Sequence, residues 1–522
     1  MGVSSLSQAE QYLVKGEYRL AEQTFTELTH NRPSSKETGY AFMGLGQLAL
    51  MAKKGDAAVE HLSHACEFLS GEIKPLCLLA DAFNMVNAHE DALTVLNYAN
   101  QVVPESATLR YQLAQQQILM GESEQAKAHL KLAIEQLSQR YLDATDLFSI
   151  EALSLFANCL LSFSCLQKVQ FDRQQVAPLT CQSANAHFDS QIQTQTYALL
   201  ELCDKNYRQH SSVDGIKVRL HYALANQFHR QTHYAQALTH YRQANRSQFE
   251  QCKVTTSELT AYFDLIKAFA GPDALAIQSD QTFDVTPIFI LGLPNSGASR
   301  LEQMLCAHPQ VDSAGECSYL ADDVLTTAYK LTAKHYPRSL SDLSTEQLNH
   351  LAEHYLNRLK QFVNPEFDAN ALSHSNQRFH PEVTHIIDRL PANFQSIGLI
   401  YKLFPHAKVI NVRREANAVK WAVYQRCFAG NQPYFCSLTE FEHYQHAYNS
   451  LMAHWDKTLP GVVFDLDGER LISKAEKQLS TLLCFCQLPE DESVITHSAV
   501  QSQGIAGDQG WQHYQKLISG QM

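Results

Sequence analysis

A 34-residue period in the first part of the chain constrains its fold more than any other sequence feature. Ala58, Ala92 and Ala126 recur at this interval, each shortly after a turn. Small residues recur twelve positions before these alanines and seven positions after them, with a leucine between: Gly46, Ala80 and Ala114, then Ala65, Ala99 and Ala133, with Leu62, Leu96 and Leu130. Small residues at fixed positions let two helices approach closely, and large ones fill the space between them. The period therefore predicts stacked pairs of helices.

Two further copies of the pattern flank these three. The earlier copy carries Ala9, Tyr12, Gly16, Tyr18, Ala21, Phe25 and Pro33, and the later copy carries Leu224, Ala225, Phe228, Tyr234, Ala237, Tyr241 and Ala244. Together the copies resemble the tetratricopeptide repeat (TPR). The resemblance implies an N-terminal α-helical solenoid whose face commonly binds a peptide or protein. A structural arm or a dimerisation surface is the alternative, and the sequence leaves both readings and the oligomeric state open.

The domain limits follow from where the patterns begin and end. We predict TPR-like repeats over residues 1–138 and further helices over 139–250, with one clear repeat at 218–250. A linking helix is predicted over 251–284, and an α/β domain over 285–522.

The α/β domain is predicted to begin with a strand, a glycine loop and a helix. "PIFILGL" is a continuous apolar run, as expected of a strand buried on both faces. Gly292 and Gly297 then frame a loop, and the apolar residues that follow have helical spacing. In this context the backbone N–H groups of residues 296–299 would point at one oxyanion. The candidate anion-binding residues are Asn295, Ser296, Gly297, Ala298 and Ser299.

The loop distinguishes between classes of phosphate-binding protein. Kinase-type loops carry lysine directly after the second glycine, where this chain has Ala298, so Mg-ATP phosphotransfer is disfavoured. The stretch resembles the sulfotransferase loop Pro-Arg-Ser-Gly-Thr-Thr, whose ligand is the 5′-phosphosulfate of 3′-phosphoadenosine-5′-phosphosulfate (PAPS). "HPQVDSAGECSYL" and "HIIDRLPANFQSIGLIYKLFPHAKVINVRREANAV" resemble later blocks of that family, in the same order. The resemblance, nearest to the protein-tyrosine type, implies a P-loop-like fold with a parallel sheet.

The resemblance also implies roles for single residues. Glu316 stands where the family has its catalytic base, and Arg389 replaces the lysine that stabilises charge on the sulfuryl group. Arg414 matches the arginine that binds the 3′-phosphate, and Arg426 a second phosphate-binding arginine. The family's serine eight positions after Arg414 is Ala422 here. If a helix spans 422–426, these two residues share one face and Arg426 compensates for the lost hydroxyl.

Each role has a plainer alternative. Glu316 can be a solvated loop residue, and Arg389 can form a structural ion pair with Asp388 or another acid. Asn295, Ala298 and Ala422 depart from the family pattern and motivate a second hypothesis, a catalytically degenerate domain in a TPR scaffold. The first hypothesis is a sulfotransferase that moves the sulfuryl group of PAPS, as co-substrate, to an acceptor hydroxyl such as a peptide tyrosine.

Composition bounds the partners and the compartment. A formal net charge of −13 argues against nucleic acid or an anionic membrane as a general partner. The apolar stretch "LFSIEALSLFANCLLSFSCL" is interrupted by Glu151 and Asn158, which predicts a buried helix rather than a membrane span. The cysteines are scattered, no spacing typical of metal ligands occurs, and the first residues lack a signal-peptide pattern. We therefore predict a cytoplasmic protein without a metal.

Overall fold

The computed structural model describes most of the chain. The described residues are 5–31, 36–52, 54–86, 88–143, 149–174, 186–364, 382–428, 430, 432–491, 493–494 and 510–518. The chain divides into two compact units, one of Met1–Leu166 with Ser190–Ile216 and one of Gln167–Asp189 with Lys217–Met522. The domain limits predicted from sequence remain predictions.

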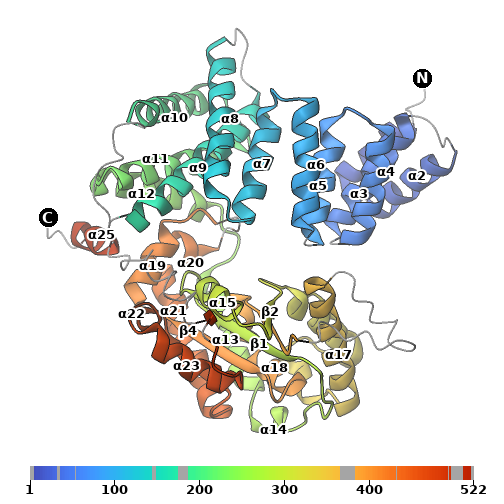
Figure 1. The fold of residues 1–522 in the computed structure, drawn as a ribbon, viewed down its shortest axis with the longest axis vertical. Helices are drawn as coiled ribbons and strands as arrows, with labels where there is room; N and C mark the ends of the chain where they lie inside the picture. Colours follow the sequence, from blue (N-terminus) through green and yellow to red (C-terminus); the bar gives the residue numbers. More distant parts are fainter. Residues whose placement is uncertain are drawn as a thin grey trace. The chain divides into compact units, whose positions relative to one another are not determined.

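The first unit is built from helices (Figure 1). They are α1 (Ser5–Lys15), α2 (Tyr18–Asn31), α3 (Lys36–Met51), α4 (Gly55–Phe68), α5 (Ile73–Met85), α6 (His89–Val102), α7 (Ala107–Leu119), α8 (Ser123–Asp143), most of α9 (Ile150–Gln174) and α10 (Ala186–Asn206). From α1 to α8, consecutive helices pack as neighbours, as expected of a helical-repeat solenoid.

The periodic residues form the contacts inside this solenoid. Ala58, Ala92 and Ala126 are each completely buried. At Gly46, an added Cβ would lie 2.4 Å from Cγ of Leu62, so α3 and α4 approach each other too closely for any side chain there. The fold class predicted for this part of the chain, an α-helical TPR-like solenoid, is confirmed.

One stretch in the described residues has the length and composition of a membrane span. It is Ile150–Gln167 in α9, with a mean hydropathy of 1.4, and 44% of it is buried. Core helices of soluble proteins meet the same criterion, so this stretch is weak evidence for a membrane.

The second unit opens with helices and continues as an α/β sheet. The helices are α11 (Val213–Arg230), α12 (Tyr234–Glu250), α13 (Thr256–Phe269), α14 (Pro272–Leu275), α15 (Ala298–Leu305), α16 (Leu325–Thr332), α17 (Thr345–Val363), α18 (Ile397–Leu403), α19 (Ala416–Tyr424), α20 (Pro433–Cys436), α21 (Leu438–Thr458), α22 (Gly468–Ser473), α23 (Ala475–Cys486) and α25 (Gly510–Ile518). Three short helical segments are η1 (Leu320–Val324), η2 (Arg338–Ser341) and η4 (Pro391–Ser396). The strands are β1 (Thr286–Gly292), β2 (Val311–Ser313), β3 (His385–Asp388), β4 (Lys408–Arg413) and β5 (Val463–Asp467).

The five strands form one parallel sheet in the order β2-β3-β1-β4-β5. Strand β1 is central, and its side chains alternate between two hydrophobic cores. Ile288 and Ile290 join the core that contains residues of α15 and α23, whereas Phe289 and Leu291 join the core that contains residues of α17, α18 and α21. The predicted strand buried on both faces, and with it the parallel α/β fold, is confirmed.

The late repeat copy, made of most of α11 and all of α12, lies within this second unit. Its Asn245 is completely buried and donates a hydrogen bond through Nδ2 to the carbonyl of Tyr424, at the end of α19, at 2.9 Å. Tyr514 of α25 is also completely buried, bonds to Nδ1 of His229 at 2.6 Å and stacks on Trp421 of α19. Helices α12 and α25 therefore both contact α19.

Candidate functional site

The site lies where the central strands of the sheet end. Strands β1 and β4 are parallel neighbours, with Gly292 opposite Val412. The chain that follows β1 is the predicted anion loop, and the chain that follows β4 carries Arg414. Because the carboxyl ends of parallel strands share one edge, the topology brings the loop and this arginine together.

The loop has the backbone conformation of an anion-binding turn. Gly292 has a φ of 145°, and a Cβ there would lie 2.7 Å from the carbonyl oxygen of Val412. Asn295 has a φ of 62°, and Gly297, with a φ of 110°, is the N-cap of α15. Ala298 begins this helix, so its N–H and that of the exposed Ser299 have no acceptor inside the helix.

Polar groups in the loop differ in their hydrogen bonding. The N–H of Ser296 donates to the carbonyl of Leu293 at 3.2 Å, so this amide is used within the loop rather than for a ligand. The hydroxyl of Ser296 and Nδ2 of Asn295 are buried and have no hydrogen-bond partner among the described residues. Such unpaired buried groups are uncommon in native proteins and mark a place where a ligand can bind.

Two arginines from the second half of the domain converge on the loop. Nη1 of Arg426 donates to Oδ1 of Asn295 at 3.0 Å, and Nη1 of Arg414 donates to the carbonyl of Asn295 at 3.4 Å. The expectation that Arg426 shares a helical face with Ala422 is wrong, because α19 ends at Tyr424. Arg426 reaches the loop from the irregular segment beyond the helix.

The neighbouring Arg413 lies apart from this pair. It forms a 3.0 Å ion pair with Asp465, and its side chain is 60% exposed. Arg414 is only 19% exposed, and its Nε lies 3.5 Å from Oε1 of Glu469. Of the two consecutive arginines, Arg414 is therefore the one at the loop.

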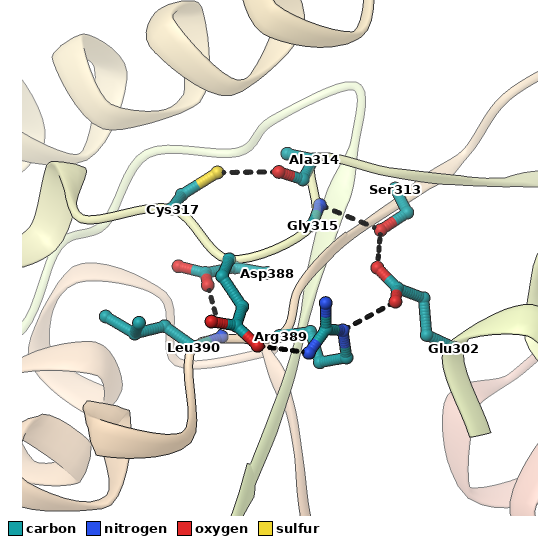
Figure 2. A network of polar contacts seen from close by, with 9 residues as sticks. Glu302, Ser313, Ala314, Gly315, Cys317, Asp388, Arg389 and Leu390 are labelled. Carbon is teal, nitrogen blue, oxygen red and sulfur yellow. Dashed lines mark hydrogen bonds and ion pairs between the residues drawn. The ribbon is translucent and has the colours of Figure 1, made fainter. Parts of the chain in front are cut away.

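The predicted base and the predicted cation are in direct contact. Nη1 of Arg389 donates to Oε1 of Glu316. Its Nε donates to Oε2 of Glu302 at 2.5 Å (Figure 2). Burial disfavours the guanidinium charge, but the two carboxylates outweigh this and raise the pKa of Arg389 above its usual value. The structure thus brings Glu316 and Arg389 together.

Sequence reasoning missed Glu302. It lies on α15, its side chain is 14% exposed, and its Oε1 accepts a hydrogen bond from the hydroxyl of Ser313. That hydroxyl in turn accepts from the N–H of Gly315 at 3.0 Å. Glu302 therefore links the loop helix to the segment that carries Glu316.

Asp388 is not a partner of Arg389. Its carboxylate is completely buried and accepts from the hydroxyl of Tyr355 at 2.5 Å and from the N–H of Leu390 at 2.9 Å. Burial raises the pKa of Asp388 to about 6, and these hydrogen bonds limit the rise. Asp388 shapes the turn after β3, so that Arg389 faces Glu302 and Glu316.

No group of three or more histidine, cysteine, aspartate or glutamate side chains that could hold a metal ion occurs in the part of the chain that the structure describes.

Comparison with known proteins shows what the part of the chain that carries this site is similar to. Residues 287–492 match the model of the Sulfotransferase family. An uncharacterized protein of Aquifex aeolicus (strain VF5) is 31% identical over 219 residues, which are 40% of this chain and 26% of that protein. Protein-tyrosine sulfotransferase 1 of Danio rerio is 27% identical over 222 residues, which are 41% of this chain and 56% of that protein. The chain thus matches about a quarter and about half of the lengths of these relatives.

Solved structures resemble each half at low overall similarity. A thermophilic TPR protein of Thermus thermophilus has 20% identity and a TM-score of 0.28, covering 42% of this chain and 97% of that one. The sulfotransferase domain of the Synechococcus PCC 7002 olefin synthase has 20% identity and a TM-score of 0.28, covering 42% of this chain and 80% of that one.

Proposed function

We propose that residues 287–492, which match the model of the Sulfotransferase family, transfer the sulfuryl group of PAPS to an acceptor hydroxyl. The observation that carries the proposal is the contact between Glu316 and Arg389 on the same sheet edge as the glycine loop.

The residues at the loop suit a doubly phosphorylated donor. The N–H groups at the start of α15 and the unpaired Ser296 hydroxyl are donors for one phosphate group. Arg414 and Arg426 supply the positive charge that the loop itself lacks. Charge-assisted hydrogen bonds of this kind are the strong ones in phosphate recognition.

The residues around Arg389 suit proton abstraction and charge stabilisation. Glu316 is 51% exposed, so an acceptor hydroxyl can approach its carboxylate and lose its proton to it. Arg389 holds a fixed positive charge beside that carboxylate, where it stabilises negative charge that develops on the transferring group. The bound donor would supply the sulfuryl group itself.

The acceptor class follows from similarity. We take a peptide tyrosine as the acceptor, since the domain is 27% identical to a protein-tyrosine sulfotransferase over 222 residues. The helical repeats would bind the acceptor peptide or its parent protein, in the cytoplasm. A catalytically degenerate domain in a TPR scaffold is the second candidate, favoured by the departures at Asn295, Ala298 and Ala422.

Calorimetry with adenosine 3′,5′-bisphosphate separates the two candidates. We expect micromolar binding to the unaltered protein and a loss of about tenfold to a hundredfold in affinity for Arg414→Ala, since a hydrogen bond to a charged group contributes about 1.5–3 kcal/mol. Arg413→Ala is the matched control, because this adjacent arginine pairs with Asp465 at the surface. No heat at high ligand concentration would support the scaffold.

Catalysis is tested separately from binding. Glu316→Gln should abolish release of adenosine bisphosphate from PAPS in the presence of a tyrosine peptide, while the affinity for adenosine bisphosphate stays unchanged. Turnover that persists in Glu316→Gln would exclude this residue as the base.

A further inference from the structure

Arg389 is held by two carboxylates in different surroundings. Its Nε bonds to Glu302, which is 14% exposed, and its Nη1 bonds to Glu316, which is 51% exposed. Its third nitrogen, Nη2, has no hydrogen-bond partner within the described residues. One edge of the guanidinium is therefore fixed in the interior, and the other faces the exposed base.

Glu302 is itself held rigidly. Its second oxygen accepts from the hydroxyl of Ser313, which accepts from the N–H of Gly315 (Figure 2). On either side of it along α15, Leu301 and Met304 are completely buried and fix the helix against the sheet. A side chain bound at both oxygens and anchored on a packed helix can hold a partner in one orientation.

Resting on the proposed function, we propose that Glu302 is a positioning residue for sulfuryl transfer. It keeps Arg389 anchored through Nε, so that Nη1 can leave Glu316 and, with Nη2, face the negative charge on the transferring group. The Glu316 carboxylate is then released to take the proton of the acceptor hydroxyl.

A single carboxylate would not serve both purposes. If Glu316 were the only acid beside Arg389, the two side chains would remain paired, and a carboxylate paired with a guanidinium is a weak base. With Glu302 present, the three side chains carry a net charge of −1, and Arg389 still has an ion-pair partner when its bond to Glu316 breaks. The buried Glu302 thus allows the exposed Glu316 to act as a base.

Two substitutions test this role. Glu302→Gln removes the charge and keeps the shape, and Glu302→Asp keeps the charge and shortens the side chain. Glu353→Gln on α17 is the matched control, because Glu353 is exposed and far along the chain from the site. Initial rates are measured with PAPS and a tyrosine peptide from pH 5 to pH 9, and thermal unfolding confirms that each variant is folded.

Glu302→Gln should lower kcat by about tenfold to a hundredfold, as for a misplaced catalytic group, with little change in KM for PAPS. The acidic limb of its pH–rate profile should move to lower pH, because Arg389 then pairs with Glu316 alone. Cys306 and Cys317 are the other titratable groups that Glu302 influences, with Asp312 beside the first and Asp388 beside the second. Burial and, to a smaller extent, the Glu302 charge raise the pKa of both thiols, so the substitution changes these pKa values only on the alkaline side and not in the range of the acidic limb. Glu302→Asp should have the same acidic limb in its pH–rate profile as the unaltered protein, and a kcat between those of the unaltered protein and Glu302→Gln.

The outcomes separate this inference from the proposed function. If the unaltered protein neither binds adenosine bisphosphate nor turns over PAPS, both are overturned. Two outcomes with an active unaltered protein would refute the positioning role alone. In the first, Glu302→Gln has the kcat of the unaltered protein. In the second, Glu302→Gln has a lower kcat but the acidic limb of its pH–rate profile does not shift. A crystal structure with adenosine bisphosphate and sulfate bound gives an answer without turnover. Arg389 should keep its hydrogen bond to Glu302 and lose its hydrogen bond to Glu316. An Arg389 that leaves Glu302 and stays on Glu316 would refute the positioning role of Glu302.

Discussion

Replacing Tyr355 by phenylalanine is expected to destabilise the second unit more at pH 8 than at pH 5. The Tyr355 hydroxyl donates to the Asp388 carboxylate at 2.5 Å, and both side chains are completely buried. Burial raises the pKa of Asp388 from its ordinary 3.8 to about 6, and the bond from Tyr355 opposes that rise. The hydrogen bond from the Tyr355 hydroxyl therefore contributes most to the free energy of unfolding when Asp388 is ionised.

The sign follows from proton binding. A raised native pKa means that folded Asp388 binds its proton more tightly than it does in the unfolded chain. Its contribution to the free energy of unfolding is therefore complete below about pH 4 and is lost as the pH rises through about 6. The separation between 3.8 and about 6 corresponds to about 3 kcal/mol.

The substitution destabilises the unit at both pH values, and more on the alkaline side. At pH 8 it removes a hydrogen bond to a charged group, about 1.5–3 kcal/mol, but at pH 5 a bond to a largely neutral carboxyl, about 0.5–1.5 kcal/mol. The destabilisation should therefore be larger at pH 8 by about 1 kcal/mol.

Urea unfolding followed by tryptophan fluorescence measures this directly. The three tryptophans, Trp421, Trp455 and Trp511, all belong to the second unit, so the signal reports on that unit alone. Tyr448→Phe is the control, because its buried hydroxyl donates at 2.5 Å to the neutral side chain of Asn411 and its loss should not depend on pH. Equal destabilisation of the Tyr355 variant at both pH values would refute the reasoning.

Three further predictions concern the solenoid, the loop and the support of α19. Gly46→Ala should cost the first unit about 1–3 kcal/mol by overpacking against Leu62; an unchanged melting curve by circular dichroism would contradict the close approach. Arg426→Gln should weaken adenosine bisphosphate binding by about tenfold in calorimetry, because a charged donor at the loop is lost; full affinity would remove Arg426 from the site. Asn245→Leu should leave the buried carbonyl at the end of α19 unpaired and cost about 1–3 kcal/mol, measured as a lower urea midpoint of the tryptophan signal, and an unchanged midpoint would show that α12 does not support α19.

Features encoded by local sequence were predictable. The solenoid could be predicted because close helix contact requires small residues at a fixed interval, and Ala58 and its equivalents are buried as the period predicts. The strand, loop and helix from Thr286 to Leu305 could be predicted because an apolar run, two glycines and helical spacing are each visible in the sequence.

Features created by distant parts of the chain were not. Glu302 lies on the polar side of an amphipathic helix, where a glutamate normally faces solvent. Its contact with Arg389, which follows β3 and is distant in the sequence, cannot be predicted from that pattern. Arg426 was predicted from the family resemblance, and only the helical face that it was expected to share with Ala422 is wrong, because α19 ends at Tyr424. Local pattern fixes neither the end of a helix to within a few residues nor the partner that a side chain meets across the fold.

Asn295 stands where the related family has an arginine, and its contacts indicate that other residues supply the positive charge at the loop in place of that arginine. Asn295 has a φ of 62°, a left-handed conformation that asparagine tolerates better than residues with long side chains. Its side chain accepts from Arg426 and its carbonyl from Arg414, so this residue holds two guanidinium groups at the loop. An arginine in its place would bring a third positive charge against these two and remove the acceptor that orients Arg426. Positive charge is thus retained at the loop but comes from residues that follow β4, so the absence of the family's arginine from position 295 is not by itself evidence that the anion site has been abandoned.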